Sequence, residues 1–142
     1  MNEQRTFVTF NAVFPDDFEF LESGDIAVPG GRNICNVIMG ILQNLGLTVS
    51  KPEQHQFYGW ELTAKKDGCE YWFLLQYPES WLLIAQDKTG IFGRMKSQAT
   101  SFGATLADLN QKLAEDERFS NIRWFAKGEY ENGKSLGSKT PE

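Results

Sequence analysis

The one histidine and the two cysteines are the side chains of this 142-residue chain that could support nucleophilic chemistry. A thiol becomes an effective nucleophile when a neighbouring base such as imidazole takes its proton. His55 lies in a polar run, and the sequence alone does not bring it to Cys35 or Cys69. Gly-x-Ser-x-Gly, Ser-x-x-Lys and Walker motifs are absent from the sequence. We therefore expect no catalytic residues, an exposed loop histidine and two reduced, buried thiols; a Cys–His pair or a Cys35–Cys69 disulfide is the alternative.

Metal and phosphate binding have weak sequence support. Glu53 and His55 offer two ligands in one loop, whereas a structural zinc site usually needs four. The glycines at residues 30 and 31 precede an expected helix and could present N–H groups to an anion. Their spacing is not that of a dinucleotide-binding loop, so a simple helix-entry turn is favoured. We expect no metal and no cofactor.

An acidic segment, residues 14–25, is the most informative feature for function. It holds five carboxylates, with no lysine or arginine, and the apolar side chains of Phe14, Phe18, Phe20 and Leu21 lie between them. Aromatic side chains surrounded by carboxylates suit recognition of a basic protein, because the rings bury area and the charges speed encounter. The alternative is a solvated loop whose phenylalanines close the core. The predicted partner-binding residues are Asp16, Asp17, Phe18, Glu19 and Glu22.

Trp72 is a further candidate for partner binding. It alternates with Tyr71 and Phe73 in an expected strand, so these side chains lie on opposite faces of the sheet. If helices cover only one face, either Trp72 or the other two rings remain exposed. An aromatic side chain on an open sheet face marks a binding surface.

The hydrophobic periodicity predicts a single α+β domain over residues 1–127. It has a mainly antiparallel sheet of about five strands, with two helices packed on one face, in the order β-α-β-β-β-α-β. The expected strands cover residues 6–14, 57–64, 69–76, 81–86 and 121–125, and the expected helices cover residues 32–45 and 105–116. Residues 87–103 are a candidate functional loop, or one more short strand. Residues 128–142 show no core pattern and are expected to be a flexible tail.

Charge and hydropathy exclude several classes of function. The chain has 14 Lys and Arg against 19 Asp and Glu, for a net charge of −5. That balance disfavours a broad nucleic-acid-binding surface, which requires clustered cations. No apolar run is long enough to span a membrane, and the first residues do not resemble a signal peptide. We expect a cytoplasmic protein that binds neither membrane nor nucleic acid; its oligomeric state stays open.

Two stretches carry a resemblance to known proteins. The first runs from Tyr58-Gly59-Trp60-Glu61-Leu62 through Trp81-Leu82-Leu83-Ile84, and the second runs from Leu113 to Trp124 and closes with Ile122-Arg123-Trp124. Both are similar to small, mostly uncharacterised bacterial α+β proteins. The chain also resembles toxin-immunity proteins in its small size, its acidic net charge and its many aromatic residues. The resemblance implies a non-enzymatic inhibitor that neutralises a bacterial toxin. The alternatives are a secretion or effector chaperone, or a small-ligand-binding or thiol-dependent enzyme domain.

Overall fold

A computed structural model describes residues 4–56, 58–90 and 101–142 of the chain. Within those ranges its elements follow the order β1 (Phe7–Ala12), β2 (Glu19–Phe20), β3 (Ile26–Val28), α1 (Arg32–Asn44), β4 (Thr48–Val49), β5 (Glu53–His55), β6 (Gly59–Lys66), β7 (Cys69–Gln76), β8 (Trp81–Asp87), α3 (Ser101–Glu115), β9 (Phe119–Phe125) and α4 (Lys127–Asn132). Most of the candidate loop at residues 87–103 lies outside the described residues. None of the helices in these ranges has the length and apolar character needed to cross a bilayer.

The main sheet has seven strands, and each of its pairings is antiparallel. Its order is β4-β6-β7-β8-β1-β9, and β5 also pairs with β6. A turn at Asp67-Gly68 joins β6 to β7 directly, because Lys66 pairs with Cys69. Both turn residues have positive φ angles, 50° and 84°, as a type I′ hairpin turn requires.

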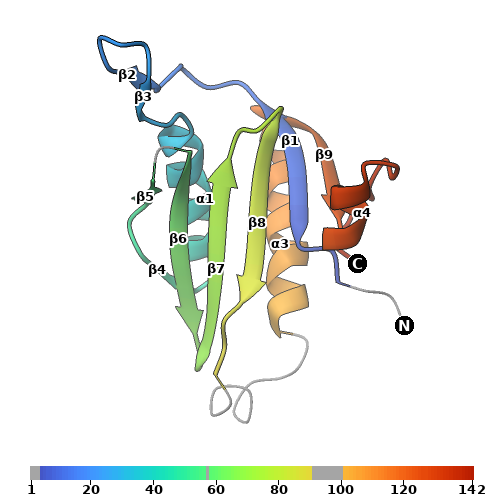
Figure 1. Ribbon diagram of the computed structural model, residues 1–142. Helices are drawn as coiled ribbons and strands as arrows, with labels where there is room; N and C mark the ends of the chain where they lie inside the picture. Colours follow the sequence, from blue (N-terminus) through green and yellow to red (C-terminus); the bar gives the residue numbers. More distant parts are fainter. Residues whose placement is uncertain (1–3, 57, 91–100) are drawn as a thin grey trace.

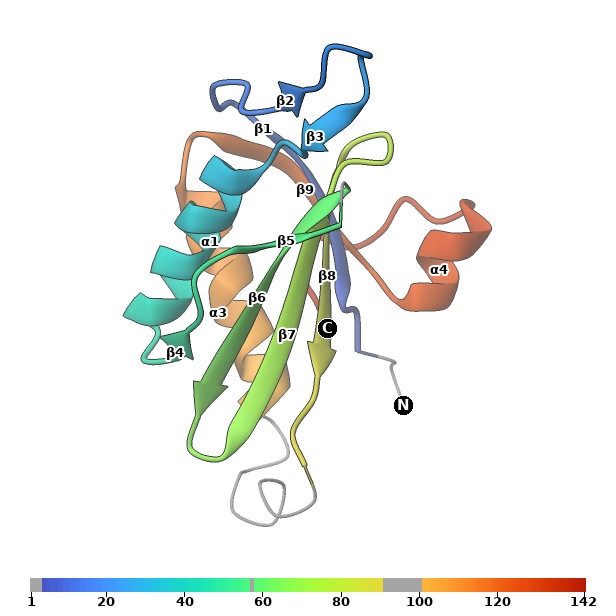
Figure 2. The same cartoon turned by 60° about the vertical axis from the view of Figure 1, so that its left-hand side comes forward.

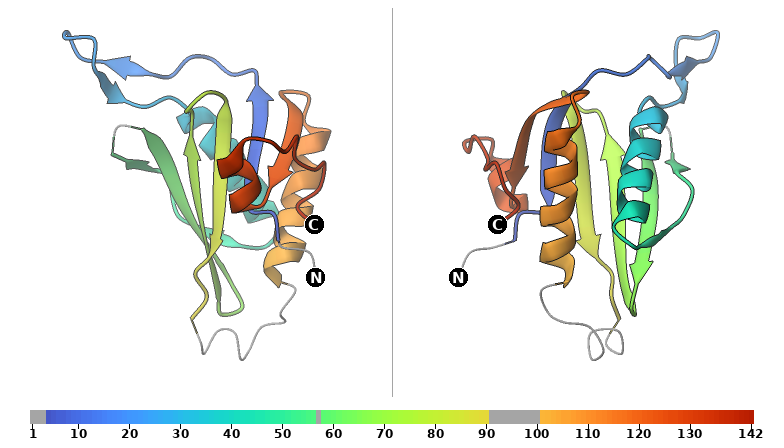
Figure 3. Two further views of the ribbon diagram at one scale, coloured as in Figure 1. Left: turned by 45° about the vertical axis from the view of Figure 1, so that its right-hand side comes forward. Right: turned by 180° about the vertical axis from the view of Figure 1, so that it is seen from behind.

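Helices α1 and α3 lie side by side on one face of the sheet (Figure 1 and Figure 3, right). The core between them and the strands is apolar, which is the main stabilising contribution to such a layered fold. It includes Val8, Ile38, Leu42, Leu62, Phe73, Leu75, Leu106, Leu109 and Trp124. Tyr71 and Phe73 are both buried on this face, and Tyr71 packs on Phe102 of α3 with ring centroids 5.0 Å apart.

The predicted α+β class is confirmed, as is a mainly antiparallel sheet, but the predicted strand count and order are wrong. Two short strands, β4 and β5, pair with β6 at the margin of the sheet. Their two and three residues are too few to show a hydrophobic alternation. Strands β2 and β3 form a separate two-stranded sheet, and a third described helix, α4, follows β9.

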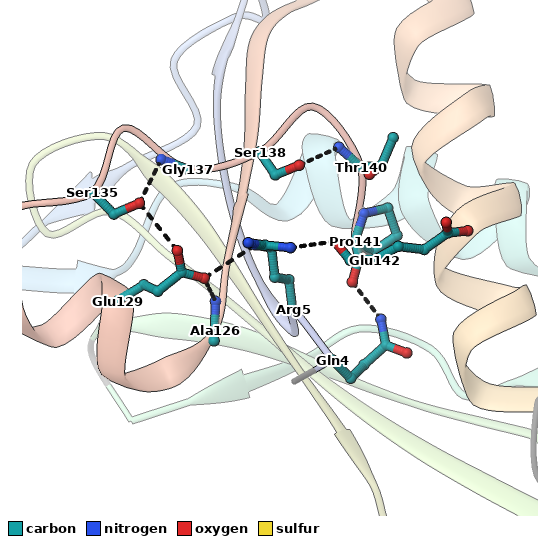
Figure 4. A network of polar contacts seen from close by, with 10 residues as sticks. All are labelled: Gln4, Arg5, Ala126, Glu129, Ser135, Gly137, Ser138, Thr140, Pro141 and Glu142. Atoms are coloured by element: carbon teal, nitrogen blue, oxygen red, sulfur yellow. Dashed lines mark hydrogen bonds and ion pairs between the residues drawn. The ribbon is translucent and has the colours of Figure 1, made fainter. Parts of the chain in front are cut away.

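The segment expected to be a flexible tail, residues 128–142, contains α4 and an isolated bridge between Ser138 and Trp124. Helix α4 lies on the sheet face opposite α1 and α3 (Figure 3, left), where Tyr130 contacts Phe7 and Phe125. Glu129 accepts hydrogen bonds from Ala126 N–H, Ser135 Oγ and Arg5 Nε (Figure 4). The backbone hydrogen bond from Ala126, more than the ion pair with Arg5, lowers the pKa of Glu129.

Candidate functional site

The β2–β3 hairpin projects beyond the end of the main sheet, away from both layers (Figures 1 and 2). Glu19 pairs with Val28 and Phe20 pairs with Ile26. Phe20 and Leu21 are 61% and 56% exposed. Five exposed residues at the end of this hairpin, Glu19, Phe20, Leu21, Glu22 and Asp25, form what we call the hairpin surface.

Asp17 is not part of the hairpin surface, because its carboxylate binds the start of α1. Its Oδ1 accepts a hydrogen bond from Gly31 N–H at 2.8 Å, and its Oδ2 accepts one from Asn33 N–H at 2.9 Å. The first N–H groups of a helix lack partners within the helix, and a negative charge there also interacts favourably with the helix dipole. Gly31 has a φ of 108°, a conformation that glycine adopts readily. Asp17 therefore links the acidic segment to α1.

Phe18 lies between the hairpin surface and the body of the protein. Its ring covers Gly30 so closely that a Cβ atom on that glycine would lie 2.2 Å from Phe18 Cε2. The same ring stacks on Phe20, with centroids 6.1 Å apart and an interplanar angle of 13°. Asp16 stabilises the turn that precedes Phe18, because Asp16 Oδ1 accepts a hydrogen bond from Phe18 N–H at 3.0 Å. Glycine at residue 30 thus makes room for the phenylalanine.

A cleft of about 190 Å³ opens at the base of the hairpin. It brings together the acidic segment, the first buried turn of α1 and the connection between β7 and β8. Its lining residues are Ala12, Phe14, Pro15, Asp16, Asp17, Phe18, Ile34, Tyr77 and Trp81. Tyr77 and Trp81 form one side, with ring centroids 4.6 Å apart. The cleft therefore combines four aromatic rings with two carboxylates.

The structure separates Trp72 from this cleft. Trp72 is half-buried on the sheet face opposite α1 and α3, four residues along β7 from its end at Gln76, which is about 13 Å of extended strand. Its Nε1 donates to Glu61 Oε2 at 3.1 Å, and Lys88 Nζ lies 5.9 Å from its ring centroid. The prediction that Trp72 faces away from Tyr71 and Phe73 is confirmed. Its ring contacts Glu61 and Lys88, which lie outside the set of described residues that line the cleft.

The structure does not bring either cysteine to the histidine. His55 Nδ1 lies 3.0 Å from Glu61 Oε2, on the sheet face away from α1. Cys35 is buried in α1, and burial raises the pKa of its thiol to about 12. Cys69 is also buried and free. Cys69 pairs with Lys66 at one end of β6, and His55 pairs with Gly59 at the other end. The seven residues between Gly59 and Lys66 separate the two pairs by about 23 Å along the strand.

Comparison with known proteins gives no match: no protein-family model, no curated protein and no solved structure is identified as similar to this chain.

Of the six residues predicted from the sequence, Asp16, Asp17 and Phe18 lie at the cleft, while Glu19 and Glu22 are on the hairpin surface. Sequence reasoning missed Tyr77 and Trp81 as part of this site. Trp81 is the first residue of the strand expected over residues 81–86, and it does begin β8. Tyr77 lies in the turn between two expected strands. Only the turn's Tyr-Pro pair, which leaves an aromatic ring at an exposed position, could have signalled Tyr77.

Proposed function

We propose that this chain is a non-enzymatic protein-binding module of the toxin-immunity type, which neutralises a basic protein by binding it on the hairpin surface. One observation carries the proposal. Phe20 and Leu21 are largely exposed on a projecting hairpin, and the exposed acidic residues Glu19, Glu22 and Asp25 flank them in the sequence.

Exposed apolar side chains support the choice of a protein partner. Burying apolar surface stabilises a fold by about 25 cal/mol per Å², yet Phe20 and Leu21 are left in contact with water. Contiguous exposed apolar residues with a polar rim are typical of interaction sites. A phenylalanine on a hairpin can enter a pocket of a partner and contribute much of the binding energy.

The charge pattern supports a basic partner. No lysine or arginine occurs from residue 6 through residue 31, so every charged residue of the hairpin surface is negative. Such a surface attracts a basic protein over about a Debye length, roughly 8–10 Å at physiological salt, and accelerates association. An inhibitor of a toxin benefits from fast association, because the toxin must be captured before it acts.

Site-specific photo-cross-linking in the cells from which the gene comes tests this proposal. A photoreactive phenylalanine derivative replaces Leu21 in one variant and Asp108, an exposed residue of α3, in the control. We expect one basic protein to be cross-linked at residue 21 and not at residue 108, and the purified chain to suppress that protein's toxicity. Equal labelling at both positions, or no product at residue 21, would refute the proposal.

A further inference from the structure

We infer that the cleft at the base of the hairpin receives one arginine side chain of the basic partner. This inference rests on the proposed function, since the arginine belongs to the protein that binds the hairpin surface. Phe18 joins the two places, because it lines the cleft and stacks on Phe20. A partner docked on the hairpin surface is therefore also beside the cleft.

The walls of the cleft suit a planar cation. Phe14, Phe18, Tyr77 and Trp81 line the cleft. Arg118 already lies over the ring of Phe14, and Phe18 stacks on Phe20. The half-exposed ring of Tyr77 is therefore the one that an incoming guanidinium would contact, because aromatic rings attract cations. Tyr77 is 50% exposed, so a side chain can reach the cleft from solvent. Arginine fits better than lysine because its flat guanidinium stacks on rings and donates to a carboxylate through two N–H groups at once.

The two carboxylates of the cleft have different roles. Both oxygens of Asp17 accept hydrogen bonds from the start of α1. Asp16 uses Oδ1 for Phe18 N–H, and its Oδ2 has no hydrogen bond to any residue that the structure describes. Asp16 is therefore the carboxylate that an incoming guanidinium would engage.

Arg118 of this protein already binds between an aromatic ring and a carboxylate next to the cleft. The Cζ atom of Arg118 lies 4.8 Å from the ring centroid of Phe14. Asp116 accepts hydrogen bonds from Nε and Nη2 of that arginine at 3.0 and 2.7 Å. Arg118 is not among the described residues that line the cleft. The combination of a ring face and a carboxylate that the cleft offers is thus one in which this fold already binds guanidinium.

An NMR titration of the full chain with N-acetyl-arginine amide tests the inference. The neutral isostere N-acetyl-citrulline amide is the matched control ligand. We expect saturable shifts at the amides of Phe18 and Tyr77 and at the indole N–H of Trp81, with a dissociation constant on the order of 10 mM for so small a ligand. Citrulline should bind at least about ten-fold more weakly, because it has no charge. Equal shifts with both ligands would overturn the inference.

Two variants separate local contact from net charge. Asp16→Asn removes the charge and keeps an oxygen for the Phe18 N–H, and we expect it to weaken arginine-amide binding about five-fold or more. Glu22→Gln removes the same charge from the same segment outside the cleft, and binding should stay within about two-fold.

A third variant, Tyr77→Ala, tests the aromatic wall of the cleft. Because Tyr77 lies at an exposed turn, this change should weaken binding without disturbing the fold. Equal weakening by Asp16→Asn and Glu22→Gln would contradict a site in the cleft.

The two proposals can fail separately. If the arginine amide gives no saturable shift while residue 21 still cross-links a basic protein, the cleft inference is overturned and the proposed function stands. If the amide binds and residue 21 cross-links nothing, the cleft recognises arginine but the proposed function fails.

Discussion

At the scale of single residues, the carboxylates of the acidic segment have different roles although they are close in sequence. Asp17 binds backbone N–H groups of α1, and Asp16 shapes the turn before Phe18. Glu19 and Glu22 are exposed on the hairpin. A charge-reversal experiment on the whole segment would mix these effects, so variants for binding should leave Asp17 intact.

The reactivity of Cys35 is a direct test of the non-enzymatic part of the proposal. The thiolate is the reactive form, and burial raises the pKa of this thiol to about 12. At pH 8 the native thiol should therefore react with iodoacetamide about 100-fold more slowly, or slower still, than the same thiol in urea. Mass spectrometry of the alkylated Cys35 peptide measures both rates.

Native labelling of Cys35 should also keep rising with pH well above 9, because the folded protein holds the proton that the unfolded chain releases near that pH. The control is free cysteine under the same conditions. Native labelling as fast as in urea would show an accessible thiolate and would favour the thiol-dependent alternative.

At the scale of elements, the β2–β3 hairpin is attached to the body at several points. Asp17 connects its base to α1, and Gln54 of β5 donates a hydrogen bond to Ala27 O at 3.1 Å. Trp60 Nε1 donates to Pro29 O at 2.8 Å. A hairpin held at its base presents Phe20 at lower entropic cost than a free loop would, which favours binding.

Replacing Asp17 with alanine should destabilise the protein through α1. The substitution removes acceptors for two N–H groups at the start of the helix. Losing a capping interaction of this kind costs about 1–2 kcal/mol in the free energy of unfolding. Urea denaturation followed by circular dichroism measures it. Asp16→Ala is the matched control and should cost less than about 0.5 kcal/mol, since it loses one exposed turn contact. Equal stability of the two variants would contradict the capping role.

Elements with a local pattern could be predicted from the sequence. The hairpin of β6 and β7 follows from alternating apolar residues on both sides of Asp67-Gly68, and in the structure Lys66 pairs with Cys69 across that turn. The apolar stripe over residues 32–45 predicted a helix, and α1 covers Arg32–Asn44. In both cases neighbouring residues in the chain carry the whole signal.

Elements whose stability comes from distant partners could not be predicted. Strand β5 is a polar tripeptide that becomes a strand by pairing with β6. Tyr77 and Trp81 reach the acidic segment only because β8 pairs with β1, which places Trp81 opposite Phe10. The cleft depends on that long-range pairing, and no local pattern in the sequence encodes it.

At the scale of the whole molecule, the hairpin surface lies apart from the packed layers. Helices α1 and α3 cover one sheet face, α4 lies on the other, and the hairpin surface projects from one end (Figures 1 and 2). Because the hairpin is remote from the core, a partner could bind it without rearranging the fold. Charge changes at the hairpin should then affect association far more than stability.

The most direct test of the central claim is the association rate constant between this chain and the basic protein cross-linked at residue 21, measured by stopped flow at low and physiological salt. The hairpin variant carries Glu19→Lys, Glu22→Lys and Asp25→Lys. The control variant carries Asp108→Lys, Glu131→Lys and Glu142→Lys, three exposed residues away from the hairpin and the cleft, with the same change in net charge. We predict that the hairpin variant associates about ten-fold or more slowly at low salt and with a weaker salt dependence, while the control stays within about three-fold of the unmodified protein. Equal rates for the two variants would contradict binding through the hairpin surface.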